Sequence, residues 1–569
     1  MAAGSNSFQM MDHRVLLGVA AIAVVSILTV GPVVYVLIAS FDVSEIGAAF
    51  EFGLEGWTDV FASPKTFRSI VYSFILSVRV PIAIVTAFAI AWCLIRLEIP
   101  GRRFIELSLW FGFVLPSVPM MLGWILLLDP NYGLLNTLLR QLPFIDGPVF
   151  SIYSAAGIIW VHLALTTVPI MVILLAPAMR QLDSAFEEAA DMSGAGLAMT
   201  LRKITIPLLM PAILTAFIAG LIRSLEAFEI EQLLGVPVNI FVYSTRIFDL
   251  VNNEPPQFAQ AMALSLLFVV MLIVMSGFYQ AYLRHSGTRA TITARGVRLQ
   301  ARIRPWWVYL ISGFLIFYIC VTIFLPLCIL VLGSFNKLFG FFFMEDAWTA
   351  NHWINVFRDD RFIRATVTSV VLGLSVGFLG VLAFAAIAWL LVRGNVWGKD
   401  FLSMIVWLPL GIPGLVLGVT LLSMMLNVPG ISALYGTIIP LVVALVIHAM
   451  PIGVQLLRGA IAQVSGELEE AGTMSGGRFG YIFRKITLPL IAPALASVFL
   501  LTFAGTIRDI STILLIAAPG TRTMSLLMFD FASIGRLESA TVVGVLIAAI
   551  CLVMTALATH IGGRLGIRS

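Results

Sequence analysis

The sequence predicts an all-α, polytopic membrane protein with about 12 transmembrane helices, built as two parallel repeats of six helices. The composition is the first observation: 60% of the 569 residues are hydrophobic and 11% are charged, whereas soluble globular proteins carry about 25% charged residues. The second is a series of apolar stretches long enough to cross a bilayer. The third is a polar segment that occurs twice, at 187–213 and at 469–495.

A bilayer-spanning helix needs roughly 20 predominantly apolar residues. The stretches that meet this length, six in each half, are 15–40, 69–95, 105–128, 152–177, 212–234, 259–283, 306–333, 366–392, 402–425, 434–457, 494–517 and 541–560. The stretches 212–234 and 494–517 contain charged residues, so their limits are the hardest to place. The first stretch is too long for a signal-peptide core and no small-residue cleavage pattern follows it, so we expect a retained helix.

The distribution of Lys and Arg predicts the orientation of these helices. With the N-terminus placed in the cytoplasm, the cytoplasmic segments carry about twice as many basic residues as the outer segments, as the positive-inside rule requires. Both termini and both polar segments are then cytoplasmic. The formal net charge of +4 reflects this topology. Because the basic residues are spread among short loops, we expect no nucleic-acid partner.

The two polar segments, which we call the repeated segments, align without a gap at an offset of 282 residues. Glu, Ala and Met favour a short helix at the start of each, and Gly194 or Gly476 can end or bend it. A second helical run carries an Arg-Lys pair and stops near Pro207 or Pro489. Each segment should therefore project from the membrane as two short helices at an angle. An ordinary amphipathic loop is the alternative, but duplication at one fixed offset argues against it.

The repeated segments resemble the cytoplasmic loop signature of binding-protein-dependent ABC importer permeases, which reads E-A-A, three residues, G, nine residues, I-x-L-P. The first copy has Ile206 where Leu is usual, and it matches at Glu188, Ala189, Ala190, Gly194, Ile204 and Pro207. The second copy has Gly472 in place of the second Ala, and it matches at Glu470, Ala471, Gly476, Ile486, Leu488 and Pro489. The resemblance covers both halves and therefore nearly the whole chain.

This resemblance implies a transport subunit rather than an enzyme. Two copies of a separate ABC ATPase would dock from the cytoplasm, a solute-binding protein would deliver the solute from outside, and lipid of the cell inner membrane would surround the helices. ATP would bind to the partner subunits and no cofactor to this chain, which contains no GxxxxGK[ST] loop. The residues expected to couple to the ATPase are Glu187, Glu188, Ala189, Ala190, Gly194, Arg202, Lys203, Pro207, Glu469, Glu470, Ala471, Gly476, Arg484, Lys485 and Pro489.

The chain divides into two fused permease units, residues 1–283 and 306–569, joined by an Arg-rich cytoplasmic linker at 284–305. Six spans return the chain to the cytoplasm, so both units have the same orientation. A pseudo-two-fold axis along the membrane normal should relate them, with the transport pathway at their interface.

Other features have more ordinary interpretations. Pro116 and Pro409 predict broken third helices that line a cavity, with plain packing kinks as the alternative. The longer outer loop of the first unit, at 129–148, offers a contact for a partner on that side.

We expect His162 and His448 to be buried and hydrogen-bonded, and we expect no metal site. The four cysteines, which lack metal-type spacing, should pack as small hydrophobic residues.

The fifth helices carry charges at membrane depth, where ionisable side chains are costly and usually face a partner or a water-filled cavity. The stretches 219–237 and 504–519 are similar in sequence, and their alignment pairs Arg223 with Arg508. Two interpretations stay open: an internal ion pair that locks the halves together, or a set of side chains that line the translocation pathway. The residues concerned are Arg223, Glu226, Glu229, Arg508 and Asp509.

The solute follows only from the resemblance. Fused permeases of about this length are similar to ferric iron importers, and the stretch 224–237 resembles their fifth-helix region. Thiamine, polyamine and aminoethylphosphonate permeases share the architecture and remain alternatives. An ion-coupled secondary transporter, with Glu226 and Glu229 carrying protons, and a membrane scaffold are alternatives from other classes, but neither needs a duplicated docking segment.

Overall fold

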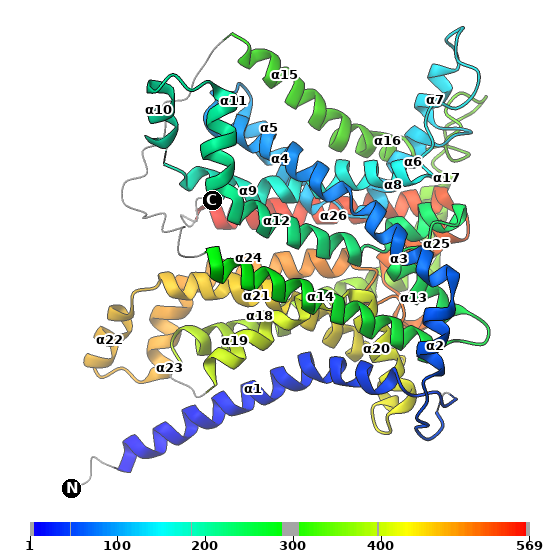
Figure 1. Ribbon diagram of the computed structural model, residues 1–569. Helices are drawn as coiled ribbons and strands as arrows, with labels where there is room; N and C mark the ends of the chain where they lie inside the picture. Colours follow the sequence, from blue (N-terminus) through cyan, green and yellow to red (C-terminus); the bar gives the residue numbers. More distant parts are fainter. Residues whose placement is uncertain (1–4, 46, 184, 287–305, 395–397, 565–569) are drawn as a thin grey trace.

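The protein is nearly all-helical in the computed structural model, which describes residues 5–45, 47–183, 185–286, 306–394 and 398–564 (Figure 1). Within these ranges ten helices are long and apolar enough to cross a membrane, and three further helix pairs are sharply bent at a short break. Two isolated bridges, Asp42 with Phe52 and Asn336 with Trp348, follow the first helix of each half. The predicted fold class is confirmed. Most of the linker, residues 287–305, lies outside the described residues.

The two halves follow the same order of elements, although some helices that are continuous in one half are divided in the other. In the N-terminal half the helices are α1 (Ser5–Ala39), α2 (Glu55–Ala62), α3 (Pro64–Leu76), α4 (Arg79–Arg96), α5 (Arg102–Val114), α6 (Ser117–Leu128), α7 (Leu134–Leu139), α8 (Ala155–His162), α9 (Val168–Gln181), α10 (Ala185–Met192), α11 (Leu197–Thr200), α12 (Ile206–Glu226), α13 (Tyr243–Asn252) and α14 (Phe258–Ser286). In the C-terminal half they are α15 (Val308–Ile319), α16 (Leu325–Gly333), α17 (Asn351–Arg358), α18 (Asp360–Val392), α19 (Lys399–Trp407), α20 (Gly414–Asn427), α21 (Ile439–Gln463), α22 (Gly466–Met474), α23 (Phe479–Ile482), α24 (Leu488–Arg508), α25 (Met524–Ser533) and α26 (Leu537–Arg564).

The third span of each half is broken, as its prolines predict. Helices α5 and α6 meet at 105°, and α19 and α20 meet at 98°. Helix α5 ends at Val114, just ahead of Leu115 and Pro116, because the residue before a proline is disfavoured in the helical conformation. Bends of this size are breaks rather than packing kinks.

The predicted limits of the fifth spans are wrong. The continuous helical stretches are Leu197–Glu226 and Gly480–Arg508, not 212–234 and 494–517. The expected stops near Pro207 and Pro489 do not occur, because a π-helical turn precedes each proline, at Leu201–Thr205 and at Phe483–Thr487, and the helix continues through it. A wider turn is one way in which a helix accommodates a local disruption of its hydrogen bonds.

The two halves exchange their first helices. Helix α1 packs against α19 and α20 of the C-terminal half as well as α14 of its own half, while α15 and α16 pack against α5 and α6 of the N-terminal half and α16 also contacts α26. The α6–α16 contact brings the backbones together, since a Cβ added at Gly123 would lie 2.3 Å from the carbonyl oxygen of Pro326. Small residues permit such close approach between membrane helices. Each half therefore holds the other through its broken third span.

The molecule has two distinct ends. The pairs α10–α11 and α22–α23 lie at the same end, towards the left of Figure 1, together with the start of α1 and the end of α26. We call this the repeat end. Helices α2, α7 and α17 lie at the opposite end, which we call the far end.

Candidate functional site

The first helix of each repeated segment ends in the same way. In the first copy the N–H of Ala195 bonds to the carbonyl of Ala190 at 2.9 Å, and the N–H of Gly194 bonds to the carbonyl of Asp191 at 2.9 Å. This pair of bonds is a Schellman motif, which needs a left-handed residue. Gly194 has φ +77° and Gly476, in the same position of the second copy, has φ +80°. The glycines therefore end α10 and α22, as their spacing predicts.

A carboxylate ties each repeated segment to its own half. Oε2 of Glu187 lies 2.9 Å from Nε of Arg96, at the end of α4, and its Oε1 accepts a hydrogen bond from Thr205 at 3.0 Å. In the second copy, Glu469 lies 3.5 Å from Arg393 and accepts a bond from Thr487 at 2.9 Å. The ion pair thus fixes α10 or α22 to the second span, and the threonine fixes it to the π-helical turn.

The two tethers differ in burial, which predicts a difference in stability. The side chains of Arg96 and Glu187 are 5% and 10% exposed, whereas those of Arg393 and Glu469 are 23% and 24% exposed. Removing one partner of a buried pair costs about 3–5 kcal/mol, because it leaves an uncompensated charge, while an exposed pair is worth about 0–1 kcal/mol. Glu187→Ala should therefore lower the midpoint of thermal unfolding in detergent far more than Glu469→Ala. Equal losses would contradict this account of the tethers.

The other predicted coupling residues lie on the surface of the repeat end, apart from Ala190, which packs inward. Exposed polar and small residues are Glu188, Ala189, Arg202, Lys203, Pro207, Glu470, Ala471, Arg484, Lys485 and Pro489. Large apolar side chains lie among them, and Met192 and Met474 are 92% and 90% exposed at equivalent positions. The exposed large apolar side chains of the two segments are Met192, Leu197, Met199, Leu208, Met474, Tyr481 and Leu490, and Phe186 and Leu468 lie immediately before them.

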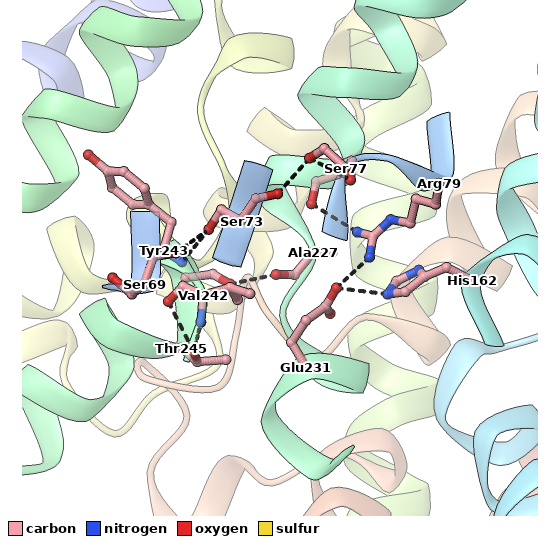
Figure 2. Close-up of polar contacts among 12 residues, drawn as sticks. Ser69, Ser73, Ser77, Arg79, His162, Ala227, Glu231, Val242, Tyr243 and Thr245 are labelled. Carbon is pink, nitrogen blue, oxygen red and sulfur yellow. Dashed lines mark hydrogen bonds and ion pairs between the residues drawn. The ribbon is translucent and has the colours of Figure 1, made fainter. Parts of the chain in front are cut away.

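Beyond each fifth helix the chain turns back, along 227–242 and along 509–523. We call these stretches the return segments. At the end of the first, the backbone N–H of Tyr243 donates to Ser73 of α3 at 2.8 Å (Figure 2). At the end of the second, the N–H of Met524 donates to Ser369 of α18, also at 2.8 Å. Each return segment is thereby anchored to the second span of its own half.

A buried triad of ionisable side chains holds the first return segment in addition. Glu231 Oε1 lies 2.9 Å from Nη1 of Arg79, at the start of α4, and 2.8 Å from Nε2 of His162, at the end of α8 (Figure 2). Arg79 also donates to the carbonyl of Ser224 at 2.9 Å. The repeat offsets place Ile513 and Ala444 at the positions of Glu231 and His162. The triad is therefore specific to the N-terminal half.

Of these three residues only His162 was singled out from the sequence, and nothing in the sequence placed it beside the other two. Arg79 and His162 lie 152 and 69 residues from Glu231 in the chain. The prediction that His162 is buried and hydrogen-bonded is confirmed. His448, on α21, is half-buried.

Among the cysteines Cys551 is buried and Cys93 partly buried, but Cys320 and Cys328 are exposed, so the prediction that all four are packed is wrong for these two.

The charges at the ends of the fifth helices make different contacts in the two halves. Arg223 lies 3.8 Å from Glu226 in its own helix, as their spacing predicts, and its side chain is 60% exposed. Arg508 instead crosses to the other half, where Nη1 donates to the carbonyls of Phe113 and Val114 at 3.1 and 2.9 Å. These carbonyls end α5 at the break in the third span. A cation is well placed there, since a helix C-terminus carries unsatisfied carbonyls and partial negative charge.

The sequence alignment that matches Arg223 with Arg508 is wrong, because the two helices correspond differently in the structure. Helices α12 and α24 each contain 21 residues and end at Glu226 and Arg508. Glu226 is therefore the counterpart of Arg508. Asp509 starts the second return segment, where its carboxylate accepts two bonds from Thr512 at 3.0 Å. Glu229 lies on the first return segment, close to Asp509 and to the backbone of Ser511 in the opposite half.

Known proteins with similar sequences share the permease architecture. The chain is 24% identical to the ABC transporter permease protein y4fN of Sinorhizobium fredii. The alignment spans 405 residues and covers 70% of this chain and 69% of that protein. It is 22% identical to the Fe(3+)-transport system permease protein FbpB 2 of Haemophilus influenzae, over 87% of this chain and 90% of that protein. It is 23% identical to the 2-aminoethylphosphonate transport system permease protein PhnV of Salmonella typhimurium, over 43% of this chain and 91% of that protein.

Among solved structures, a bacterial ABC transporter involved in the import of alginate is 17% identical, with a TM-score of 0.38 over 46% of this chain and 96% of that chain. The family described as binding-protein-dependent transport system inner membrane component matches residues 79–289 and 369–567, one stretch in each half and together most of the chain. The chain therefore belongs to this family, as a permease subunit of an ABC importer in which two permease units are fused.

Proposed function

We propose that two copies of a separate ATPase dock on the repeated segments and drive import of a solute between the two halves. The observation that carries this proposal is the duplicated construction of the repeat end, where each helix is closed by a left-handed glycine and tied by a carboxylate to its own half. Such a segment transmits a push to the whole half, because it cannot move independently of α4 or α18. ATP binds to the partner subunits.

The repeat end faces the cytoplasm in this proposal, with both termini on the same side. The excess of Lys and Arg in the loops at that end supports this orientation. The exposed apolar side chains around Met192 and Met474 support docking of a protein there, since such a patch would otherwise face water. Membership of the importer family also sets aside the ion-coupled transporter and the scaffold.

The proposed pathway runs between α12 and α24. We infer that this pathway is closed at the far end of the molecule. There the Phe228 ring of the first return segment lies 6.1 Å from the Phe529 ring of α25 in the other half. Nearer the repeat end, many residues of α12 and α24 are only half-buried. Arg223 lies near His448 of the opposite half and keeps a largely exposed guanidinium.

Ferric iron is the solute that we propose first, because relatives that match most of this chain are named for ferric transport. Aminoethylphosphonate is the second candidate, favoured by the relative of that name and by Arg223. An exposed guanidinium suits a solute that carries an anionic group, and Fe³⁺ meets this condition when it travels with an anion. Thiamine and polyamines receive no comparable support from the contacts described above.

Uptake into proteoliposomes that contain the complete transporter tests both the pathway and the solute. Glu226→Gln with Glu229→Gln should reduce ATP-dependent uptake severalfold while the ATPase still co-purifies, because Glu226 pairs with Arg223 at the end of α12 and Glu229 lies near Asp509 of the opposite half. Normal uptake by this variant would place the pathway elsewhere. Radiolabelled iron and 2-aminoethylphosphonate, each presented with its own purified binding protein, identify the solute by which one accumulates.

A further inference from the structure

The break in the third span is closed off differently in the two halves. In the C-terminal half a 3₁₀ turn, Leu408–Gly411, follows α19, and the N–H of Ile412 donates to the carbonyl of Pro409 at 3.2 Å. In the N-terminal half α5 ends at Val114, and among the described residues no such turn follows before Pro116. The last carbonyls of a helix have no partner within it, and leaving them without a donor away from water costs free energy. The first break therefore needs a donor from elsewhere in the molecule.

Arg508, at the end of α24 in the other half, is that donor. Its Nη1 donates to the carbonyls of Phe113 and Val114 at 3.1 and 2.9 Å. Its Cζ lies 5.9 Å from the centre of the Phe113 ring, within the range of a cation–π contact. The side chain is half-buried and forms no ion pair among the residues that the structure describes. The contacts of this guanidinium therefore lie across the interface between the halves.

The N-terminal half does not return this contact from the equivalent position. Glu226 is the counterpart of Arg508, because α12 and α24 have the same length and end at these two residues. An ionised carboxylate accepts hydrogen bonds and has none to donate to a carbonyl. The Oε2 atom of Glu226 lies 3.8 Å from Arg223 of its own helix. The bond across the halves is therefore one-sided at this position, and it serves the break that lacks a turn of its own.

We propose that Arg508 is a latch that holds the two halves in the state closed at the far end; this rests on the proposed function, in which the halves separate to admit the solute. In the closed state the guanidinium satisfies the carbonyls of Phe113 and Val114. When the halves separate, α24 withdraws from α5, and water in the pathway reaches all three groups. Loss of Arg508 therefore penalises the closed state alone, and a change that acts on one of two states shifts their ratio.

The distance between the tips of the two return segments tests the latch. Val238→Cys and Gly520→Cys place one spin label on each half, at exposed positions related by the offset of 282 residues, after replacement of the four native cysteines. In the otherwise wild-type complete transporter, pulsed electron–electron double resonance should give a longer distance with a non-hydrolysable ATP analogue than without nucleotide. Arg508→Met should populate the longer distance without nucleotide. The ratio of open to closed molecules should rise about tenfold or more, because a hydrogen bond to a charged group contributes that much.

Two further variants separate the latch from a general loosening of the protein. Arg508→Lys should lie between the wild type and Arg508→Met, because an ammonium group still donates to carbonyls. Arg246→Met removes another arginine that is shielded from solvent, but the partners of Arg246, Thr66 and Asp249, lie in its own half. Asp249 keeps its ion pair with Lys65, at 3.0 Å. Arg246→Met should therefore leave the distance between the tips unchanged.

Wild-type distances in Arg508→Met, in a complex whose wild-type form opens with the ATP analogue, would overturn the latch. Equal opening by Arg246→Met would also overturn it, since loss of any such arginine would then explain the change. If Arg508→Met does not accumulate, Arg508→Gln, whose side chain is shorter and uncharged, takes its place with the same expected shift. If the wild-type tips do not separate in a complex that still imports its solute, the proposed separation of the halves fails, and this inference with it.

Discussion

Met192→Glu combined with Met474→Glu is expected to abolish transport and co-purification of the ATPase. These are the most exposed large apolar side chains of the repeated segments, and they occupy equivalent positions. Methionine is common at the apolar centre of protein interfaces, and loss of one such anchor costs about 2 kcal/mol or more, which is roughly thirtyfold in affinity. A buried carboxylate adds a desolvation penalty at each of the two sites.

The control for this variant is Phe144→Glu, because Phe144 is also highly exposed but lies in the outer loop that follows α7. This substitution makes the same kind of change at the far end and should leave ATPase binding intact. Each single variant, Met192→Glu or Met474→Glu, should have an intermediate effect. Full ATPase binding by the double variant would remove the repeated segments from the interface.

Glu231→Gln is expected to produce the largest loss of folding stability. The substitution leaves the guanidinium of Arg79 buried without its counter-charge, and breaking a buried ion pair in this way costs about 3–5 kcal/mol. Both side chains are almost completely shielded from solvent. The midpoint of thermal unfolding, followed by size-exclusion chromatography of the heated detergent-solubilised protein, should fall by several degrees or the protein should fail to accumulate.

A second substitution distinguishes the unpaired charge from other effects of the change. Arg79→Met with Glu231→Gln removes both charges and should recover most of the lost stability, because replacing a buried pair with apolar groups is often close to neutral. Glu470→Gln, at an exposed position of α22, should change the unfolding temperature little. If the double variant were as unstable as Glu231→Gln alone, the ion pair would not explain the loss.

The features predicted correctly from the sequence depend on residues close together in the chain. Gly194 and Gly476 end their helices because the Schellman motif involves only six consecutive residues. Pro116 breaks α5 through the backbone of its own neighbour. The duplication can be recognised from the sequence alone, because the two copies align at a fixed offset of 282 residues.

The features that were missed depend on residues brought together by the fold. Arg96 and Glu187 are 91 residues apart, and Arg508 meets the carbonyl of Phe113 across 395 residues. Apolar periodicity also could not separate a helix that ends at Glu226 from one that continues, because charged residues lie on both sides of that point. The exchange of the first helices between the halves left no local pattern, so it followed only from packing.

Movement of the two repeated segments towards each other is the central step of the proposed transport mechanism. Ala185→Cys and Glu467→Cys place one spin label in the first turn of α10 and one in the first turn of α22, at equivalent exposed positions, after replacement of the four native cysteines. Pulsed electron–electron double resonance then measures the distance between the two spin labels in the complete transporter. We predict a shorter distance with a non-hydrolysable ATP analogue than without nucleotide. An unchanged distance distribution, in a labelled complex that still imports its solute, would contradict the account.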